Sequence, residues 1–95
     1  MNKYEITFIV KSDMEEAEIK KTAEAMKKVL TDKNAKILEE KVMGQRELAY
    51  EINKMKTGYY FLYVVEAYSD TVKEFNRVSG INENLLRHLI VKVED

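Results

Sequence analysis

The sequence has no cysteine, no proline and no tryptophan, and its only glycines are Gly44, Gly58 and Gly80. Without cysteine there is no disulfide framework, no thiolate metal ligand and no cysteine nucleophile. The missing proline and the scarcity of glycine leave no linker composition, and no internal repeat is present. These absences predict a single domain over residues 1–95.

The charges of the chain nearly cancel. Sixteen lysines and arginines stand against 17 aspartates and glutamates, for a formal net charge of -1. This balance argues against strong nonspecific binding to nucleic acid, while a local basic patch stays compatible with it. The opening residues, MNKYEITFIV, are too polar and too short for a signal peptide or a membrane span. We therefore expect a cytoplasmic protein with no membrane partner.

Groups that carry catalysis are scarce. His88 is the only histidine and lies in an apolar segment, where a structural role is expected. Glu39 and Glu40 are adjacent on a predicted strand, so they point to opposite faces and do not form a carboxylate pair. Neither a phosphate-loop nor a dinucleotide-binding fingerprint occurs. We expect no enzyme, no cofactor, no metal site and no small-molecule substrate.

Two segments carry a helical pattern. The first has the apolar stripe Ile19, Ala23, Met26 and Leu30, and the second has Val72, Phe75 and Val78. Ser12 and Glu15 match a capping box before the first helix, which should end near residue 33. Asp70 or Thr71 is expected to cap the second helix, and Gly80 is expected to end it in a left-handed conformation.

Four segments are predicted to be strands, at residues 4–10, 35–52, 59–67 and 87–93. Gly44 predicts a bulge or bend in the second strand, and NKMKTG at 53–58 predicts a hairpin loop. The order strand, helix, strand, strand, helix, strand predicts a ferredoxin-like α+β fold. In that fold a four-stranded antiparallel sheet carries both helices on one face.

The stretch TGYYFLYVV, residues 57–65, is apolar on both faces of its predicted strand. We expect the odd residues Tyr59, Phe61, Tyr63 and Val65 to form the core, because Glu66 is better tolerated on the open side. The open face should then expose Tyr60, Leu62, Val64, Ile9, Leu89 and Val91. The predicted partner-binding residues are Tyr60, Leu62, Leu89 and Val91.

Scattered basic residues on a chain with 35% charged residues usually only keep it soluble. The candidates for contact with RNA phosphates are Lys3, Lys54, Lys56, Arg87 and Lys92. Lys3 and Lys92 should lie near one end of the sheet, because the first and last strands are antiparallel neighbours. Arg87 should lie at the opposite end, with Lys54 and Lys56 on the hairpin loop. Such scattered charges can hold RNA when another molecule keeps the protein in register.

The segment KTGYYFLYV partly resembles the central strand of RNA-recognition domains, whose aromatic residues stack on bases. Tyr60 stands where that family has a small residue, and Glu5 and Thr7 would occupy the open face of the first strand. A stand-alone RNA-recognition module is therefore the alternative. A third candidate is a small enzyme of the acylphosphatase type. It is disfavoured because KSDMEE, after the first strand, is too acidic to hold an anion.

The segment GQRELAYEIN, Gly44 to Asn53, resembles the signature of the bacterial small-subunit ribosomal protein S6 family. The matching residues are Gly44, Arg46, Glu47, Leu48, Ala49, Tyr50, Ile52 and Asn53. The similarity extends to KYEITFIV, GYYFLYVVE and NENLLRHLIVK. It implies a ferredoxin-like fold and a structural role in the platform of the 30S subunit. Binding to the central domain of 16S ribosomal RNA, as a heterodimer with ribosomal protein S18, is also implied. The open apolar face would be an interface, and a basic partner would help to neutralise phosphates.

Overall fold

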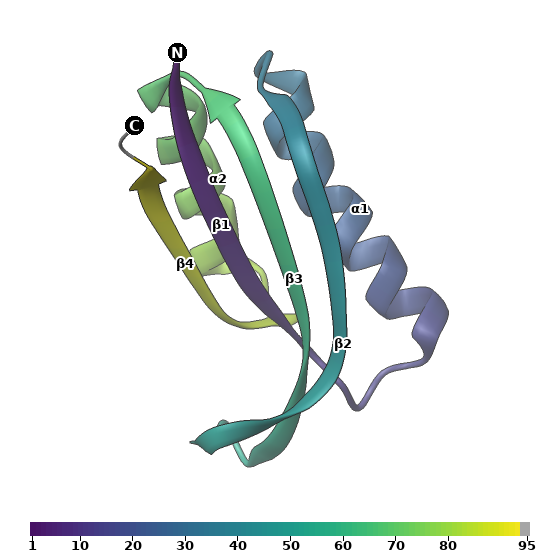
Figure 1. Ribbon diagram of the computed structural model, residues 1–95. Coiled ribbons are helices and arrows are strands. Elements are labelled where there is room, and N and C mark those ends of the chain that lie inside the picture. The colour runs from purple at the N-terminus through teal and green to yellow at the C-terminus, as the bar shows by residue number, and fades with distance from the viewer. Residues whose placement is uncertain (94–95) are drawn as a thin grey trace.

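The computed structural model describes residues 1–93, in which two helices pack on one face of a four-stranded antiparallel sheet (Figure 1). In chain order the elements are β1 (Asn2–Lys11), α1 (Glu16–Asp32), β2 (Lys36–Ile52), β3 (Met55–Ala67), α2 (Ser69–Ile81) and β4 (Leu85–Val93). The strands lie in the order β2-β3-β1-β4, and each neighbouring pair is antiparallel. The predicted ferredoxin-like fold is confirmed.

The hydrophobic core lies between the sheet and the helices and is centred on Phe8 of β1. Its ring stacks on Phe61 at 5.2 Å between centroids and meets the edge of Tyr63 at 5.4 Å. Phe75 of α2 approaches the same ring to 6.2 Å. Phe61, Tyr63 and Val65 are buried, and Tyr59 is partly buried and packs against the core, so the predicted odd set of β3 faces the helices. Burial also raises the pKa of Tyr63 above its ordinary value, because it disfavours the charged phenolate.

The start of α1 differs from the prediction. The N-cap residue is Glu15, in an extended conformation, and it makes no capping hydrogen bond with its side chain. Ser12 does not cap the helix because its hydroxyl is used elsewhere. It lies 2.7 Å from the Thr57 hydroxyl and donates to the Thr57 carbonyl oxygen at 3.2 Å. The predicted capping box is therefore wrong, and Ser12 instead joins the loop after β1 to β3.

The ends of α2 also differ from the prediction. The N-cap residue is Tyr68, which makes no side-chain cap, and Asp70 lies in the first turn. The Thr71 hydroxyl donates to the carbonyl oxygen of Lys33 at 3.0 Å, so this side chain joins α2 to the end of α1. The helix continues one residue beyond Gly80, whose φ is not positive. The predicted glycine stop is therefore wrong.

The hairpin between β2 and β3 has a shorter turn than the predicted loop at 53–58. Ile52 pairs with Met55, and only Asn53 and Lys54 lie between them, with φ of 49° and 67°. Two consecutive positive φ values are the signature of the type I′ turn, whose twist suits a two-residue hairpin. Sequence reasoning missed this turn because neither residue is a glycine.

Bulges curl the end of this hairpin, and the bulge predicted at Gly44 is one of them. Gly44 has φ 85°, and the pairing of β2 with β3 shifts between Val42 and Gly44. Further shifts occur between Ile37 and Glu39 and beyond Glu47. Each extra residue on β2 increases the local twist. The distal hairpin, residues 46–57, therefore bends across the end of the sheet, from the β2 edge towards the β4 side (Figure 1).

The core predicts a large stability difference between two apolar residues of α2. Replacing the fully buried Phe75 with alanine should cost about 3 to 5 kcal/mol, because it removes the ring packed on Phe8 and leaves a cavity. Ile81→Ala is the matched control, since Ile81 is 67% exposed, and should change stability by no more than about 0.5 kcal/mol. Urea unfolding of both variants measures the difference. Equal denaturant midpoints would contradict the described core.

Candidate protein and RNA interface on the open sheet face

The face of the sheet away from the helices, here called the open face, carries an apolar stripe. The stripe consists of Tyr60, Leu62, Val64, Leu89 and Val91. The register aligns these residues across the sheet, since Leu62 and Leu89 both pair with Thr7 and Val64 and Val91 both pair with Glu5. Leu89 is 62% exposed and Val91 is also exposed, while the three β3 residues are partly buried. The edge strand β4 thus carries the most accessible part of the stripe.

Ile9 was expected on the exposed surface, and this prediction is wrong. It is only 8% exposed, although it lies in the open-face register between Tyr60 and Arg87. Ile9 is buried because its side chain packs directly against Gly58. A Cβ atom added to Gly58 would lie only 2.3 Å from the Cγ2 atom of Ile9. Leu48 and Leu86 reach the same space, with Cδ atoms 3.4 Å and 3.6 Å from that position. The distal hairpin therefore covers Ile9.

One polar contact joins the distal hairpin to the opposite edge of the sheet. The Arg87 guanidinium on β4 donates through Nη1 to the hydroxyl of Tyr50 on β2. Its central carbon also lies 5.4 Å from the centroid of the Tyr50 ring, within the range of a cation–π interaction. Because β2 and β4 are the two edge strands, this contact spans the sheet. Sequence periodicity gave no sign of it.

The family motif builds this curled hairpin. Five of its residues, Gly44, Arg46, Leu48, Tyr50 and Ile52, occupy alternate positions along β2. Gly44 forms the bulge, Leu48 covers Gly58, and Tyr50 meets Arg87. Arg46 donates from Nε to the Met43 carbonyl oxygen at 3.4 Å, close to the bulge. Ala49 lies between Leu48 and Tyr50 and so points to the other side of the strand.

The five basic residues predicted to bind RNA do not form one cluster. Lys3 pairs with Val93 and Lys92 pairs with Tyr4, so both lie near one end of the sheet, as expected, with Arg87 near the other. Since the Tyr4 side chain is in the core, alternation puts Lys92 on the helix side and Lys3 on the open face. Lys54 lies in the turn and Lys56 in β3. Their RNA contacts stay a prediction.

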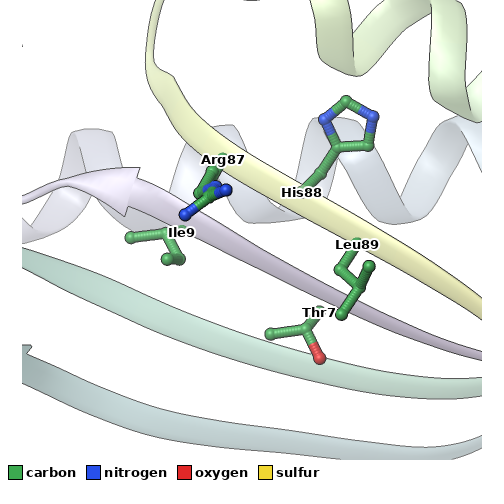
Figure 2. Close-up of a pocket in the computed structure, with 5 residues that line it drawn as sticks. All are labelled: Thr7, Ile9, Arg87, His88 and Leu89. Atoms are coloured by element: carbon green, nitrogen blue, oxygen red, sulfur yellow. The ribbon is translucent and has the colours of Figure 1, made fainter. Parts of the chain in front are cut away.

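An open depression lies beside Arg87 and is lined by Thr7, Ile9, Arg87, His88 and Leu89 (Figure 2). His88 points away from it, to the other side of β4, where Nε2 lies 2.7 Å from Oδ1 of Asn76 in α2. On the open face the depression is thus lined by two apolar side chains, Ile9 and Leu89, together with Thr7 and Arg87. Within residues 1–93 no group of three or more His, Asp or Glu side chains could hold a metal ion.

Comparison with known proteins decides the family. A family model described as ribosomal protein S6 matches residues 3–92. The chain belongs to the ribosomal protein S6 family. It is 47% identical over its full length to the small ribosomal subunit protein bS6 of Halalkalibacterium halodurans, all of which is covered. It is 45% identical to the protein of the same name from Shouchella clausii, with 99% of each chain covered.

A solved S6 structure has the same fold. The crystal structure of 30S ribosomal protein S6 from Thermotoga maritima matches with a TM-score of 0.92 at 25% sequence identity. The match covers 97% of this chain and 87% of that chain. Family membership makes this chain an S6-type protein of the small ribosomal subunit, a ribonucleoprotein component of the translation machinery. No helix among residues 1–93 is long and apolar enough to cross a membrane.

The close approach at Gly58 predicts a coupled pair of substitutions in this S6 protein. Gly58→Ala should destabilise the fold by about 1 to 3 kcal/mol, because the new Cβ would overlap the Ile9 Cγ2 atom. In an Ile9→Ala background that atom is gone, so the same change should cost at least about 1 kcal/mol less. Urea unfolding of the wild type, both single variants and the double variant measures the coupling. Strictly additive costs would contradict the packing of Ile9 against Gly58.

Proposed function

We propose that this S6 protein is a noncatalytic structural component of the platform of the cytoplasmic 30S subunit. In this role it binds the central domain of 16S ribosomal RNA together with ribosomal protein S18. The proposal is supported by membership of the S6 family and by the names of its relatives, which are proteins of the small ribosomal subunit. The chemistry of the open face supports the protein partner in particular.

The single observation that carries the proposal is the exposed apolar stripe. Leu89 and Val91 expose large aliphatic side chains on β4, and the partly buried Leu62 and Val64 lie level with them on β3, across strand β1. On this face β1 places Thr7 between Leu62 and Leu89, and the exposed Glu5 between Val64 and Val91. Lys41 lies beyond Leu62, and Arg87 lies two residues before Leu89 on the same face. Apolar side chains bordered by polar and charged residues are typical of a protein interface, and the carboxylate of Glu5 within the stripe would repel a phosphate. The stripe therefore fits a protein better than an RNA backbone.

Charge supports a role for the partner in RNA binding. The chain has a formal net charge of -1, and its five candidate basic residues are spread over the two ends of the sheet and the hairpin. Binding to RNA depends strongly on the number of phosphates that are neutralised. A basic partner seated on the stripe would add positive charge beside Arg87. It would also keep the scattered lysines in register with the RNA.

The alternative of a stand-alone RNA-recognition module loses support. That module needs aromatic rings on the open face to stack on bases. Here Phe61 and Tyr63 are buried in the core, and Tyr60 is the only aromatic residue in the stripe. The aromatic residues of β3 thus serve mainly to pack the sheet on the helices.

A partner-binding test compares two exposed aliphatic residues on opposite sides of the protein. Leu89→Asp should leave the melting temperature nearly unchanged and reduce binding to S18 at least tenfold, because an unpaired carboxylate would be buried at the interface. Ile81→Asp is the matched control and should bind S18 normally, since Ile81 is exposed on α2. Thermal melts and calorimetric titration measure both effects. Normal S18 binding by a folded Leu89→Asp variant would remove the stripe from the interface.

An RNA-binding test separates the ribosomal role from the recognition module. The isolated protein should bind a 16S central-domain fragment weakly, and addition of S18 should create tight binding that falls steeply with salt. Filter binding over a range of salt concentrations, with an unrelated single-stranded RNA as control, provides the measurement. Tight binding of the isolated protein to both RNAs would instead favour the recognition module.

A further inference from the structure

Tyr50 has no packing role that explains an aromatic ring at its position. It is 57% exposed, and its described contact is with Arg87 of β4 rather than with the core. The contact exists because the distal hairpin curls over the sheet from β2 towards β4. The Tyr50 ring differs in this respect from Tyr68, which is 56% exposed, because it lies against the guanidinium of a residue on the opposite edge strand.

The geometry of the pair leaves Arg87 ready to bind an anion. A guanidinium has five N–H donors in a planar fork, and the Tyr50 hydroxyl accepts only one of them. The ring of Tyr50 restricts the rotation of the guanidinium, so less side-chain freedom is lost when a ligand binds. Among residues 1–93 no carboxylate forms an ion pair with Arg87. The remaining N–H donors of Arg87 are therefore available to bind an anion.

The charge of the hairpin favours a phosphate backbone over a single carboxylate. Arg46, Lys54 and Lys56 all belong to the hairpin that Tyr50 holds to β4. Curling the hairpin therefore brings its positive charges to the end of the sheet that carries Arg87. Glu47 and Glu51 occupy odd-numbered positions of β2, whereas Arg46 and Tyr50 occupy even-numbered positions. A polyanion can meet several separated cations at once, as a lone carboxylate cannot.

We infer that Tyr50 is a positioning residue for RNA binding: it holds the Arg87 guanidinium in the orientation that contacts an RNA phosphate. This inference rests on the proposed function, because it concerns the RNA that S6 binds together with S18. In this inference Tyr50, the tyrosine of the family motif, affects RNA binding through Arg87. Tyr50 itself needs no contact with the RNA.

The test measures binding of the S6–S18 complex to the 16S central-domain fragment over a range of salt concentrations. Tyr50→Ala should weaken binding about tenfold at low salt and reduce the slope of log affinity against log salt by about one, and Arg87→Ala should do the same. The double variant should bind no more weakly than Arg87→Ala alone. Tyr50→Phe, which keeps the ring, should retain most of the affinity. Tyr68→Ala is the control, since Tyr68 is 56% exposed at the start of α2, and should match the wild type.

A second measurement follows Arg87 in the free protein by NMR. The Nε–H signal of Arg87 should show a ring-current shift that disappears in Tyr50→Ala and persists in Tyr50→Phe. An unchanged Arg87 signal in Tyr50→Ala would overturn the inference whatever the RNA does.

The binding outcomes separate the inference from the proposed function. A wild-type complex that fails to bind the fragment overturns the proposed function. A wild-type complex that binds, with Tyr50→Ala binding equally well, overturns only the positioning role. Losses that multiply in the double variant would also overturn it, because Tyr50 would then act independently of Arg87.

Discussion

The alternation of side chains along β3 is the constraint on which the rest of the structure depends. This strand is apolar on both faces, yet the two helices cover only one of them. The register that buries Phe61 and Tyr63 beneath the helices must also turn Leu62 and Val64 to the other side. The core therefore cannot form without creating the apolar stripe. A protein of the S6 family built in this way exposes an apolar face as a consequence of its own fold.

Periodicity predicted the fold well because it reports which side of an element is buried. The choice between the two faces of β3 was also correct, and the structure explains why Glu66 decided it. Glu66 pairs with Lys3 on one side and Lys36 on the other, in the open-face register. The caps were wrong for a different reason. The hydroxyls of Ser12 and Thr71 bind carbonyl groups more than thirty residues away in sequence, and local patterns contain no information about such bonds.

The details of the candidate site were harder to predict because they depend on the path of one long hairpin. The glycine in the motif indicated the bulge at Gly44, but other shifts in the register of β2 occur without a glycine. Together they carry Leu48 over Ile9 and Tyr50 onto Arg87. A sequence pattern describes each strand separately, so it could not predict the burial of Ile9 or a contact between the two edge strands.

The central claim is that the open face, and not the helices or the β2 edge, receives the protein partner. Methyl cross-saturation NMR of this S6 protein bound to unlabelled S18 tests it most directly, because it reports which methyl groups lie against the partner. The account predicts strong saturation at Leu89 and Val91 and none at Ile81 of α2 or at Val42 of β2, which are also exposed aliphatic residues. Saturation at Ile81 or Val42, with Leu89 and Val91 unaffected, would contradict it.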